Sequence, residues 1–400
     1  MKIIKTISIF LLIHAMTAAQ DPDPYLSGLA AMSKGDLSVA IEEFSTAIDQ
    51  STRNTDIYLN RANCYYLRED YRNAIYDLKT AEKIKKYPGS YLLAKSYAAL
   101  GMMDSSIFYL ELHLQSPDKH PESYIKLDHA FIELEKTRAW NDLWKQDWYN
   151  EFEILIAEVN YLIESEDYQD ALNLADQSME TYGHRHELHS SRARIFLQYG
   201  SYKAAISAYS EAISKSNQVV SDYYIQRSKA YRNSGNPEDA LSDLSRAINL
   251  DKDNFNLIME RSILRNELGY YTDALKDISL YIQYFPDDPA ALFQKGNIYY
   301  KQGNFLKALE WYNKTLNINT DKSEYYLARG NTYLNTKTYA YALRDYSMAL
   351  DLDPRNNETY LFKGLTRYYL NDPTGACKDW KQAEEYGSLK ASEYLDKYCR

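Results

Sequence analysis

Small residues recur every 31 to 35 positions along almost the whole chain, and this repetition constrains the fold more than any other feature. In the clearest copy, Gly296 is followed twelve positions later by Ala308 and sixteen positions later by Tyr312. Two further shifts of 34 residues give Gly330, Ala342 and Tyr346, and then Gly364, Ala376 and Trp380. The second small position continues toward the N-terminus at Ala274, Ala240, Ala205, Ala171, Ser106, Ala74 and Ala40. A period of this length is typical of chains that stack one supersecondary unit many times.

Glycine and proline indicate where the helices of each unit end. Glycines lie where the first helix must stop, at Gly35, Gly101, Gly200, Gly235, Gly269 and Gly303, and glycine readily adopts the left-handed cap. Pro286 and Pro354 follow second helices and separate them from the next unit. Small residues on two facing helices allow close antiparallel packing, and no strand-like alternation interrupts the pattern. The sequence therefore predicts an all-α chain of about eleven antiparallel helix pairs.

These positions resemble the tetratricopeptide repeat (TPR) family, and the resemblance covers Tyr25 to Glu385. It implies a right-handed α-solenoid, a TPR-like superhelix in which the first helix of each pair lines a concave groove. It also implies that an extended peptide or a partner helix binds in that groove. A short amphipathic helix within residues 387–400 is expected to cap the last pair.

The middle of the chain keeps the repeat length but loses the repeat residues. Trp140 takes the small position, Trp144 takes the large one, and Trp148 follows four residues later. This spacing predicts three indoles on one stripe of one helix. They form either an aromatic core that bends the array or an open pocket for a peptide or sugar. We expect an N-terminal TPR block at 20–118, a divergent joint at 119–183 and a regular C-terminal block at 184–386.

A mostly polar row is expected on the groove side of the first helices, at the position after the small residue. It comprises Asn63, Lys95, His129, Asn160, Arg194, Lys229, Ile263, Asn297, Asn331 and Leu365, and one turn further on Tyr300, Lys301, Asn335, Tyr368 and Tyr369. Asparagine pairs with peptide backbone, and tyrosine gives rigid contact area. The candidate binding residues are Asn63, Arg194, Lys229, Asn297, Tyr300, Lys301, Asn331, Asn335 and Tyr368. The alternative is an ordinary solvated helix face.

No motif for catalysis or for a cofactor stands out. The chain has neither a dinucleotide-binding G-x-G-x-x-G sequence nor a P-loop. His186 and His189 lie three residues apart, but the run is one residue short of H-E-x-x-H and has no evident third ligand. We therefore expect neither an enzyme nor a metal or cofactor site.

The first nineteen residues have the features of a secretory signal peptide. Lys2 and Lys5 precede the apolar run 7–13, and Thr17, Ala18 and Ala19 provide small residues for cleavage before Gln20. The apolar run is far shorter than the ~20 residues of a membrane span. We expect export to a periplasmic or secreted location, typical of a bacterial TPR protein, and no transmembrane segment. The formal charge of −10, near −12 without the leader, disfavours nucleic-acid binding.

Two of the three cysteines are predicted to pair. Cys377 lies ten residues before Gly387 and Cys399 twelve residues after it. If Gly387 joins two antiparallel helices, the two thiols are level with each other. Export favours oxidation, so we predict a Cys377–Cys399 disulfide and a buried, unpaired Cys64.

The sequence thus predicts an exported scaffold whose groove binds a protein or peptide segment. Two alternatives remain open at this stage. One is a structural assembly factor of a cell-envelope complex, and the other is carbohydrate or peptidoglycan binding through exposed aromatic residues.

Overall fold

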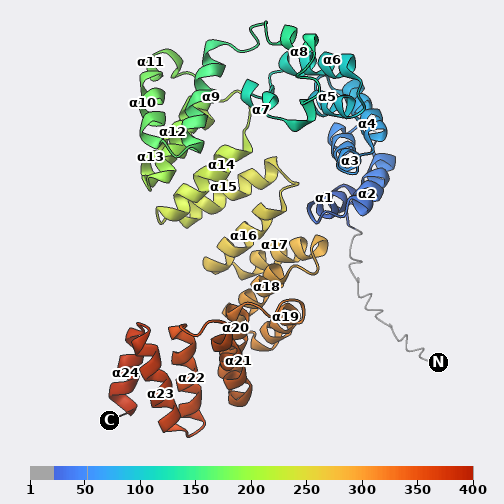
Figure 1. The fold of residues 1–400 in the computed structure, drawn as a ribbon. Helices are drawn as coiled ribbons and strands as arrows, with labels where there is room; N and C mark the ends of the chain where they lie inside the picture. The colour runs from blue at the N-terminus through green and yellow to red at the C-terminus, as the bar shows by residue number, and fades with distance from the viewer. Residues whose placement is uncertain (1–21, 52, 400) are drawn as a thin grey trace, which may run out of the picture. The chain divides into compact units, whose positions relative to one another are not determined.

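The computed structural model describes residues 22–51 and 53–399, so the predicted signal peptide at 1–19 lies outside the described residues. The described chain is entirely helical, with 24 α-helices and one 3-10 helix (Figure 1). It separates into two compact units, one up to Leu92 and one from Leu93 onward. The block boundaries at 118 and 183 remain a prediction.

Ten regular helix pairs follow one another along the chain, with one irregular segment after the third. The first unit holds α1 (Pro24–Ser33), α2 (Leu37–Gln50), α3 (Thr55–Leu67) and α4 (Tyr71–Ile84); α5 (Ser90–Ala99) crosses the boundary and α6 (Met103–Leu114) follows. The irregular segment contains α7 (Glu122–Lys126), η1 (His129–Phe131) and α8 (Arg138–Leu143). The prediction of about eleven stacked pairs is confirmed, with this segment counted as one.

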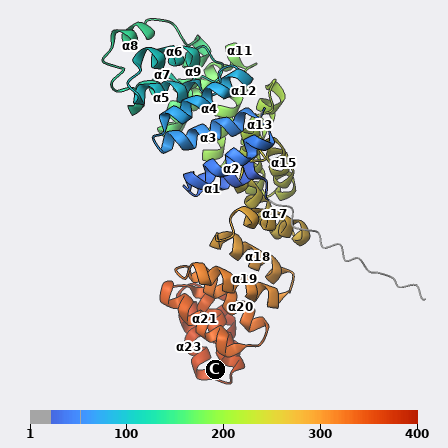
Figure 2. The same cartoon turned by 90° about the vertical axis from the view of Figure 1, so that its right-hand side faces the viewer.

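The remaining helices belong to the second unit. They are α9 (Glu151–Glu164), α10 (Tyr168–Gln177), α11 (Met179–Tyr182), α12 (His186–Gln198), α13 (Tyr202–Lys215), α14 (Ser221–Asn233), α15 (Pro237–Leu250), α16 (Phe255–Glu267), α17 (Tyr271–Tyr284), α18 (Pro289–Lys301), α19 (Phe305–Ile318), α20 (Ser323–Asn335), α21 (Tyr339–Leu352), α22 (Asn357–Tyr369), α23 (Pro373–Glu385) and α24 (Leu389–Tyr398). Figure 2 shows the same helices from the side. No described helix is long and apolar enough to cross a membrane.

In four of the described pairs, the first helix carries a glycine that lies directly against the large aromatic residue of its partner helix. A Cβ atom added to Gly296 would lie 2.6 Å from the Tyr312 ring, closer than carbon atoms can pack. Gly364 meets Trp380 at the same 2.6 Å, and Tyr312 and Trp380 are fully buried. The repeating pattern therefore marks the closest approach of the two helices in a pair.

A residue in the left-handed backbone conformation, with positive φ, follows the end of the first helix, as the glycine positions predicted. Gly303 has φ +77° just after α18, where a side chain would be strained. In the next pair, Lys337 takes the same place with φ 59°. The turn thus recurs even where the sequence does not provide glycine.

A second repeating contact joins an arginine on the first helix to an aspartate sixteen residues later on the second. Arg227 binds both oxygens of buried Asp243, at 2.7 and 2.8 Å, and its remaining nitrogen donates to Ser210 of the preceding helix at 2.9 Å. The same bidentate geometry occurs at Arg61–Asp77, Arg261–Asp277 and Arg329–Asp345. These contacts connect one pair to the next as well as the two helices within a pair.

The three tryptophans of the irregular segment do not share one helix, so that part of the prediction is wrong. α8 ends at Leu143, Trp144 is its C-cap, and Trp148 lies beyond it. Thr137 caps the helix by accepting from Trp140 N, and the six-residue helix is too short to carry a stripe. Trp140 is buried at 6% exposure, whereas Trp144 and Trp148 are half-buried.

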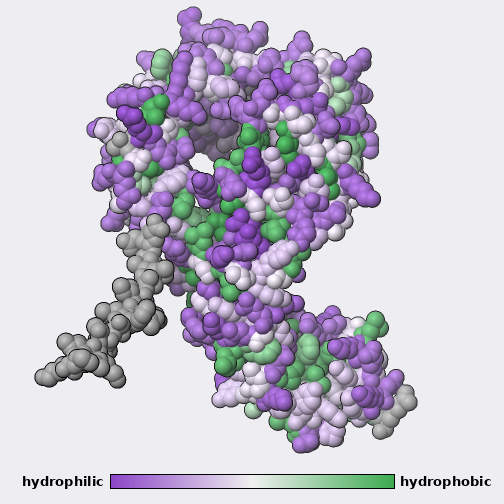
Figure 3. Space-filling model, turned by 180° about the vertical axis from the view of Figure 1, so that it is seen from behind, coloured by the Kyte–Doolittle hydropathy of each residue, from purple (hydrophilic) through white to green (hydrophobic). Residues whose placement is uncertain are grey.

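The contacts of these rings favour packing over an open aromatic platform. Trp140 and Trp144 meet edge to face with centroids 5.6 Å apart, and Lys126 lies over the Trp144 ring at 4.9 Å. The indole N–H of Trp148 donates to Leu143 O at 2.8 Å. The surface view in Figure 3 is mostly hydrophilic with scattered hydrophobic residues.

Helix α24 is held against α23 by aromatic packing and a disulfide. Trp380 contacts the rings of Tyr394 and Tyr398 on α24, with centroids 5.1 and 5.8 Å apart. The sulfur atoms of Cys377 and Cys399 are bonded, with their Cα atoms 5.8 Å apart. The predicted pairing is therefore present in the structure, and Cys64 is free and buried.

We predict that the tryptophans differ in their effect on stability. Trp140→Ala should destabilise the irregular segment by about 3–5 kcal/mol, the usual loss for a buried aromatic side chain. Trp148→Ala should cost less because its ring is half-exposed. Hydrogen exchange across residues 122–164 measures the loss of stability in each variant. Iodide quenching of tryptophan fluorescence measures how exposed the indole rings are. Equal losses from the two variants would contradict this assignment of the core.

We predict a single free thiol in natively exported protein. Closing the 22-residue separation between Cys377 and Cys399 should stabilise the C-terminal end by about 3 kcal/mol on the chain-entropy model. Thiol counting on denatured, unreduced protein measures the pairing, and Cys64→Ser should bring the count to zero. Three free thiols would refute the bridge.

Candidate functional site: a polar hollow lined by first helices

Four of the residues predicted to bind a partner line one hollow in the second unit. Asn297, Tyr300 and Lys301 come from α18, and Asn331 comes from α20. The lining is completed by Asn266 of α16, Tyr312 of α19 and Ala328 of α20, and the hollow has a volume of about 250 Å³. First helices of three successive pairs thus contribute to one concave site.

Two tyrosines of the second helices fix the orientation of the asparagines. The Tyr312 hydroxyl donates to Asn297 Oδ1 at 2.7 Å, and the Tyr346 hydroxyl donates to Asn331 Oδ1 at 2.8 Å. Burial raises the pKa of Tyr312 and of Tyr346, so both hydroxyls remain protonated donors at neutral pH. Because each asparagine oxygen already accepts a bond, the outer edge of each amide presents N–H groups.

A third tyrosine extends this arrangement between neighbouring pairs. Asn335 Nδ2 donates to the Tyr300 hydroxyl at 3.0 Å and to Asn331 O at 2.8 Å. Burial also raises the pKa of Tyr300. The Tyr300 hydroxyl proton and the Lys301 ammonium therefore join the asparagine amides as donors around the hollow. The site is built to meet acceptors such as peptide carbonyl oxygens.

Buried Asn266 Oδ1 has no hydrogen-bond partner within the described chain. Asn266 lines the hollow, but this oxygen lies below its accessible surface, so the groups open to a ligand are the donors described above. Amide, hydroxyl and ammonium donors suit the carbonyl oxygens of a peptide backbone.

The other predicted residues lie elsewhere in the fold. Arg194 Nη1 donates to Asn160 Oδ1 at 2.9 Å, and Lys229 is exposed on α14. Tyr368 is 37% exposed and packs on Tyr398 at 4.6 Å between centroids, so it belongs to the C-terminal aromatic cluster. Asn63 is half-buried on α3, in the other compact unit.

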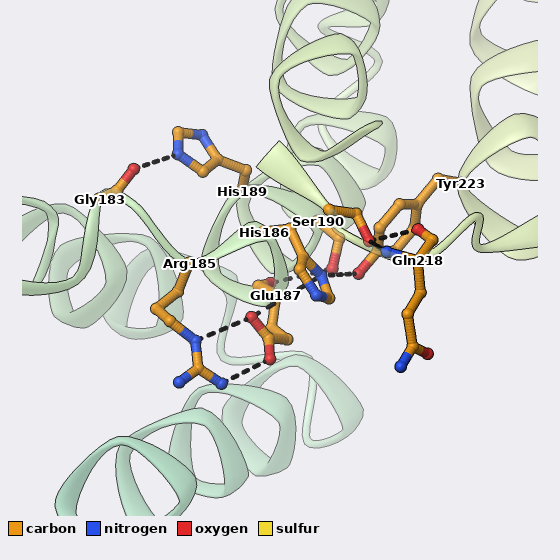
Figure 4. Close-up of polar contacts among 9 residues, drawn as sticks. Gly183, Arg185, His186, Glu187, His189, Ser190, Gln218 and Tyr223 are labelled. Atoms are coloured by element: carbon orange, nitrogen blue, oxygen red, sulfur yellow. Dashed lines mark hydrogen bonds and ion pairs between the residues drawn. The ribbon is translucent and has the colours of Figure 1, made fainter. Parts of the chain in front are cut away.

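The two histidines considered as metal ligands form hydrogen bonds with different partners (Figure 4). His186 Nδ1 lies 2.8 Å from the Tyr223 hydroxyl, and His189 Nε2 lies 2.8 Å from Gly183 O. No three metal-binding side chains gather anywhere in the described residues. These imidazoles anchor the start of α12.

The sequence alone did not reveal the tyrosine–asparagine bonds. Their signal is the recurrence of asparagine and tyrosine fifteen residues apart, at 297 and 312 and again at 331 and 346. Earlier pairs lack this combination, for example Ala193, Arg194 and Tyr209 in the pair α12 and α13. The polar hollow is therefore specific to a few pairs.

Comparisons with known proteins agree with the architecture. Models described as "Tetratricopeptide repeat" match residues 25–91, 156–219 and 221–254, and one described as "TPR repeat" matches 296–337. Together these segments cover about half of the chain. A curated relative, DnaJ homolog subfamily C member 3 from Rattus norvegicus, is 24% identical over 226 residues, which are 56% of this chain and 42% of the relative. The chain thus matches less than half the length of that protein.

Two solved structures share the fold at low sequence identity. The C-terminal part of a TPR repeat-containing protein from Cytophaga hutchinsonii is 16% identical with a TM-score of 0.50, over 60% of this chain and 99% of that one. A tetratricopeptide repeat protein from Parabacteroides merdae is 18% identical with a TM-score of 0.50, over 62% of this chain and 99% of that one. Repeat spacing, helix pairing and these matches lead to one conclusion: the chain belongs to the tetratricopeptide repeat family.

Proposed function

We propose that the chain is an exported, non-catalytic scaffold that binds an extended segment of a protein partner along its first helices. The observation that carries this proposal is the pair of asparagines held by buried tyrosines, Asn297 by Tyr312 and Asn331 by Tyr346. A fixed amide loses little conformational freedom on binding, so its hydrogen bonds contribute more to affinity. The repeat fold, typical of interaction scaffolds, supports the same function.

Export is part of this proposal and rests on the sequence. Its support is the leader of residues 1–19 and the Cys377–Cys399 disulfide, because disulfides persist in oxidising compartments such as the periplasm. A scaffold in such a compartment would have access to extended segments of envelope and secreted proteins. We propose that one of these is the partner.

The groove proposal predicts that removing the amide donors weakens binding without unfolding the array. In the double variant Asn297→Asp and Asn331→Asp, each carboxylate still accepts the tyrosine bond but no longer donates. Its negative charge also repels peptide carbonyl oxygens. We expect affinity for a capped, unstructured peptide pool to fall by at least about tenfold, the loss of roughly one hydrogen bond to a fixed group.

The matched control carries the same charge change on second helices. Asn249→Asp on α15 with Asn317→Asp on α19 places two new carboxylates on exposed residues of second helices. This control should bind like the wild type, and both double variants should retain wild-type circular dichroism. Undiminished binding by the folded Asn297→Asp and Asn331→Asp variant would rule out the hollow as the contact site.

A further inference from the structure

A larger cavity lies in the irregular part of the second unit, away from the polar hollow. It has a volume of about 660 Å³ and is bounded by the loop after α6, by α7, by α9 and by the start of α12. Its aliphatic lining comes from Pro117, Pro121, Ile154, Ile156 and Ala157. A volume of this size is within the range of about 300–1,000 Å³ that is typical of ligand pockets.

The charged side chains that line this cavity are paired with one another. Lys119 Nζ lies 2.8 Å from Glu153 Oε1, and Arg185 Nη2 lies 2.7 Å from Glu187 Oε1. Lys126 pairs with Glu122. Three cations and three anions leave the cavity with no formal net charge. The charged side chains of the lining therefore already balance one another, so the cavity has no excess charge with which to attract a charged ligand.

Each of the two aromatic rings that line the cavity already makes a cation–π contact. The Arg185 guanidinium lies 4.1 Å from the centroid of buried Phe152, and Lys119 Nζ lies 5.7 Å from that of Tyr149. The Tyr149 hydroxyl donates to His120 O at 2.6 Å, which ties the ring to the loop after α6. A sugar needs open aromatic faces for stacking, and these rings are engaged. The accessible apolar surface is therefore mostly aliphatic.

The cavity continues the row of residues expected on the groove side. Asn160 lines it and occupies the same repeat position as Asn297 and Asn331. Its oxygen accepts from Arg194 Nη1 at 2.9 Å, so its outer edge again presents N–H groups. A peptide segment lying along this row would pass the cavity with its backbone against Asn160 and its side chains facing the aliphatic lining.

We infer that this cavity is an anchor pocket for a large uncharged apolar side chain, such as leucine or phenylalanine, of the bound protein segment. The inference rests on the proposed groove function and adds a specificity to it. Buried apolar anchors in pockets commonly supply most of the binding energy of an interface. The surrounding ion pairs form a rim that disfavours charged residues at the anchor position.

The chemistry of the pocket can be tested without any peptide, through the reactivity of an introduced thiol. Ala157→Cys places the thiol in the lining, and Glu158→Cys places it on the exposed side of the same helix as a matched control. Cys64 is silent because burial raises its pKa to about 11, and the other two cysteines are bonded. The probes are benzyl, sulfonatoethyl and trimethylammonioethyl methanethiosulfonates.

For each position we compare the rate of thiol modification by the benzyl reagent with the rate by either charged reagent. We expect this ratio to be at least about tenfold greater at residue 157 than at residue 158, because burial favours the apolar group. Equal ratios at the two positions, or a faster charged reagent at 157, would overturn the inference. This outcome does not depend on whether the groove binds peptides. Failure of the pocket chemistry is thereby distinguished from failure of the proposed function.

A second measurement tests the anchor in the bound segment. Capped glycine–serine peptides with one central leucine, phenylalanine, serine, glutamate or lysine are titrated by fluorescence polarisation. Leucine and phenylalanine peptides should bind at least about tenfold tighter than the serine peptide, as expected for one buried side chain. A preference for glutamate or lysine would refute the apolar assignment.

Filling the pocket should remove this preference and nothing else. Ala157→Trp, or the benzyl adduct of Ala157→Cys if the first variant does not fold, should bind all the peptides as weakly as the serine peptide. Asn297→Asp with Asn331→Asp should weaken every peptide in parallel while keeping the ratio between them. A leucine preference that survives in the filled, folded protein would place the anchor elsewhere.

Discussion

Close contact between a glycine of the first helix and a large aromatic ring of the second recurs in four of the described helix pairs, and the candidate site depends on it. At Gly296 and Gly330 the facing tyrosine ring fills the space that a side chain would need. This contact sets how closely the helices approach and fixes the tyrosine's direction. The Tyr312 hydroxyl then emerges beside Asn297 on the other helix. A packing rule of the repeat thus positions the polar groups of the candidate site.

The buried arginine–aspartate pairs add a directional element that apolar packing lacks. Arg227 contacts Asp243 in its own pair and Ser210 in the preceding one, so it fixes the register between pairs. In the pair α18 and α19, both partners are replaced. Lys295 and Trp311 stand in the same positions, and the ammonium lies 4.1 Å from the centre of the indole ring. Lys295 Nζ also donates to Ser279 of the preceding pair at 2.9 Å. Loss of the aspartate is thus matched by an aromatic face that still attracts the cation.

Much of the fold could be predicted because the repeat pattern is local and periodic. The small positions, the glycine turns and the level placement of Cys377 and Cys399 each follow from spacing alone. The irregular segment could not be predicted in this way. Its tryptophan spacing is helical, yet the helix stops at Leu143, where tertiary packing of Trp140 against Phe131 overrides local periodicity. Spacing predicts a helix only where neighbouring pairs repeat the same contacts.

The two candidate sites also differ in whether the sequence could predict them, because one lies on repeating pairs and the other beside the irregular segment. Asn297, Tyr300 and Asn331 were found from their repeat position, because successive first helices place equivalent residues side by side. The larger cavity depends on Lys119, Tyr149 and Arg185, which lie in non-repeating loops and have no equivalents in other pairs. Regular pairs that carry equivalent residues present the same groups again, as at Asn297 and Asn331, whereas the irregular segment creates a surface of its own. Under the proposed function, the amides of Asn297 and Asn331 contribute affinity for the bound segment, and the cavity beside the irregular segment contributes its recognition.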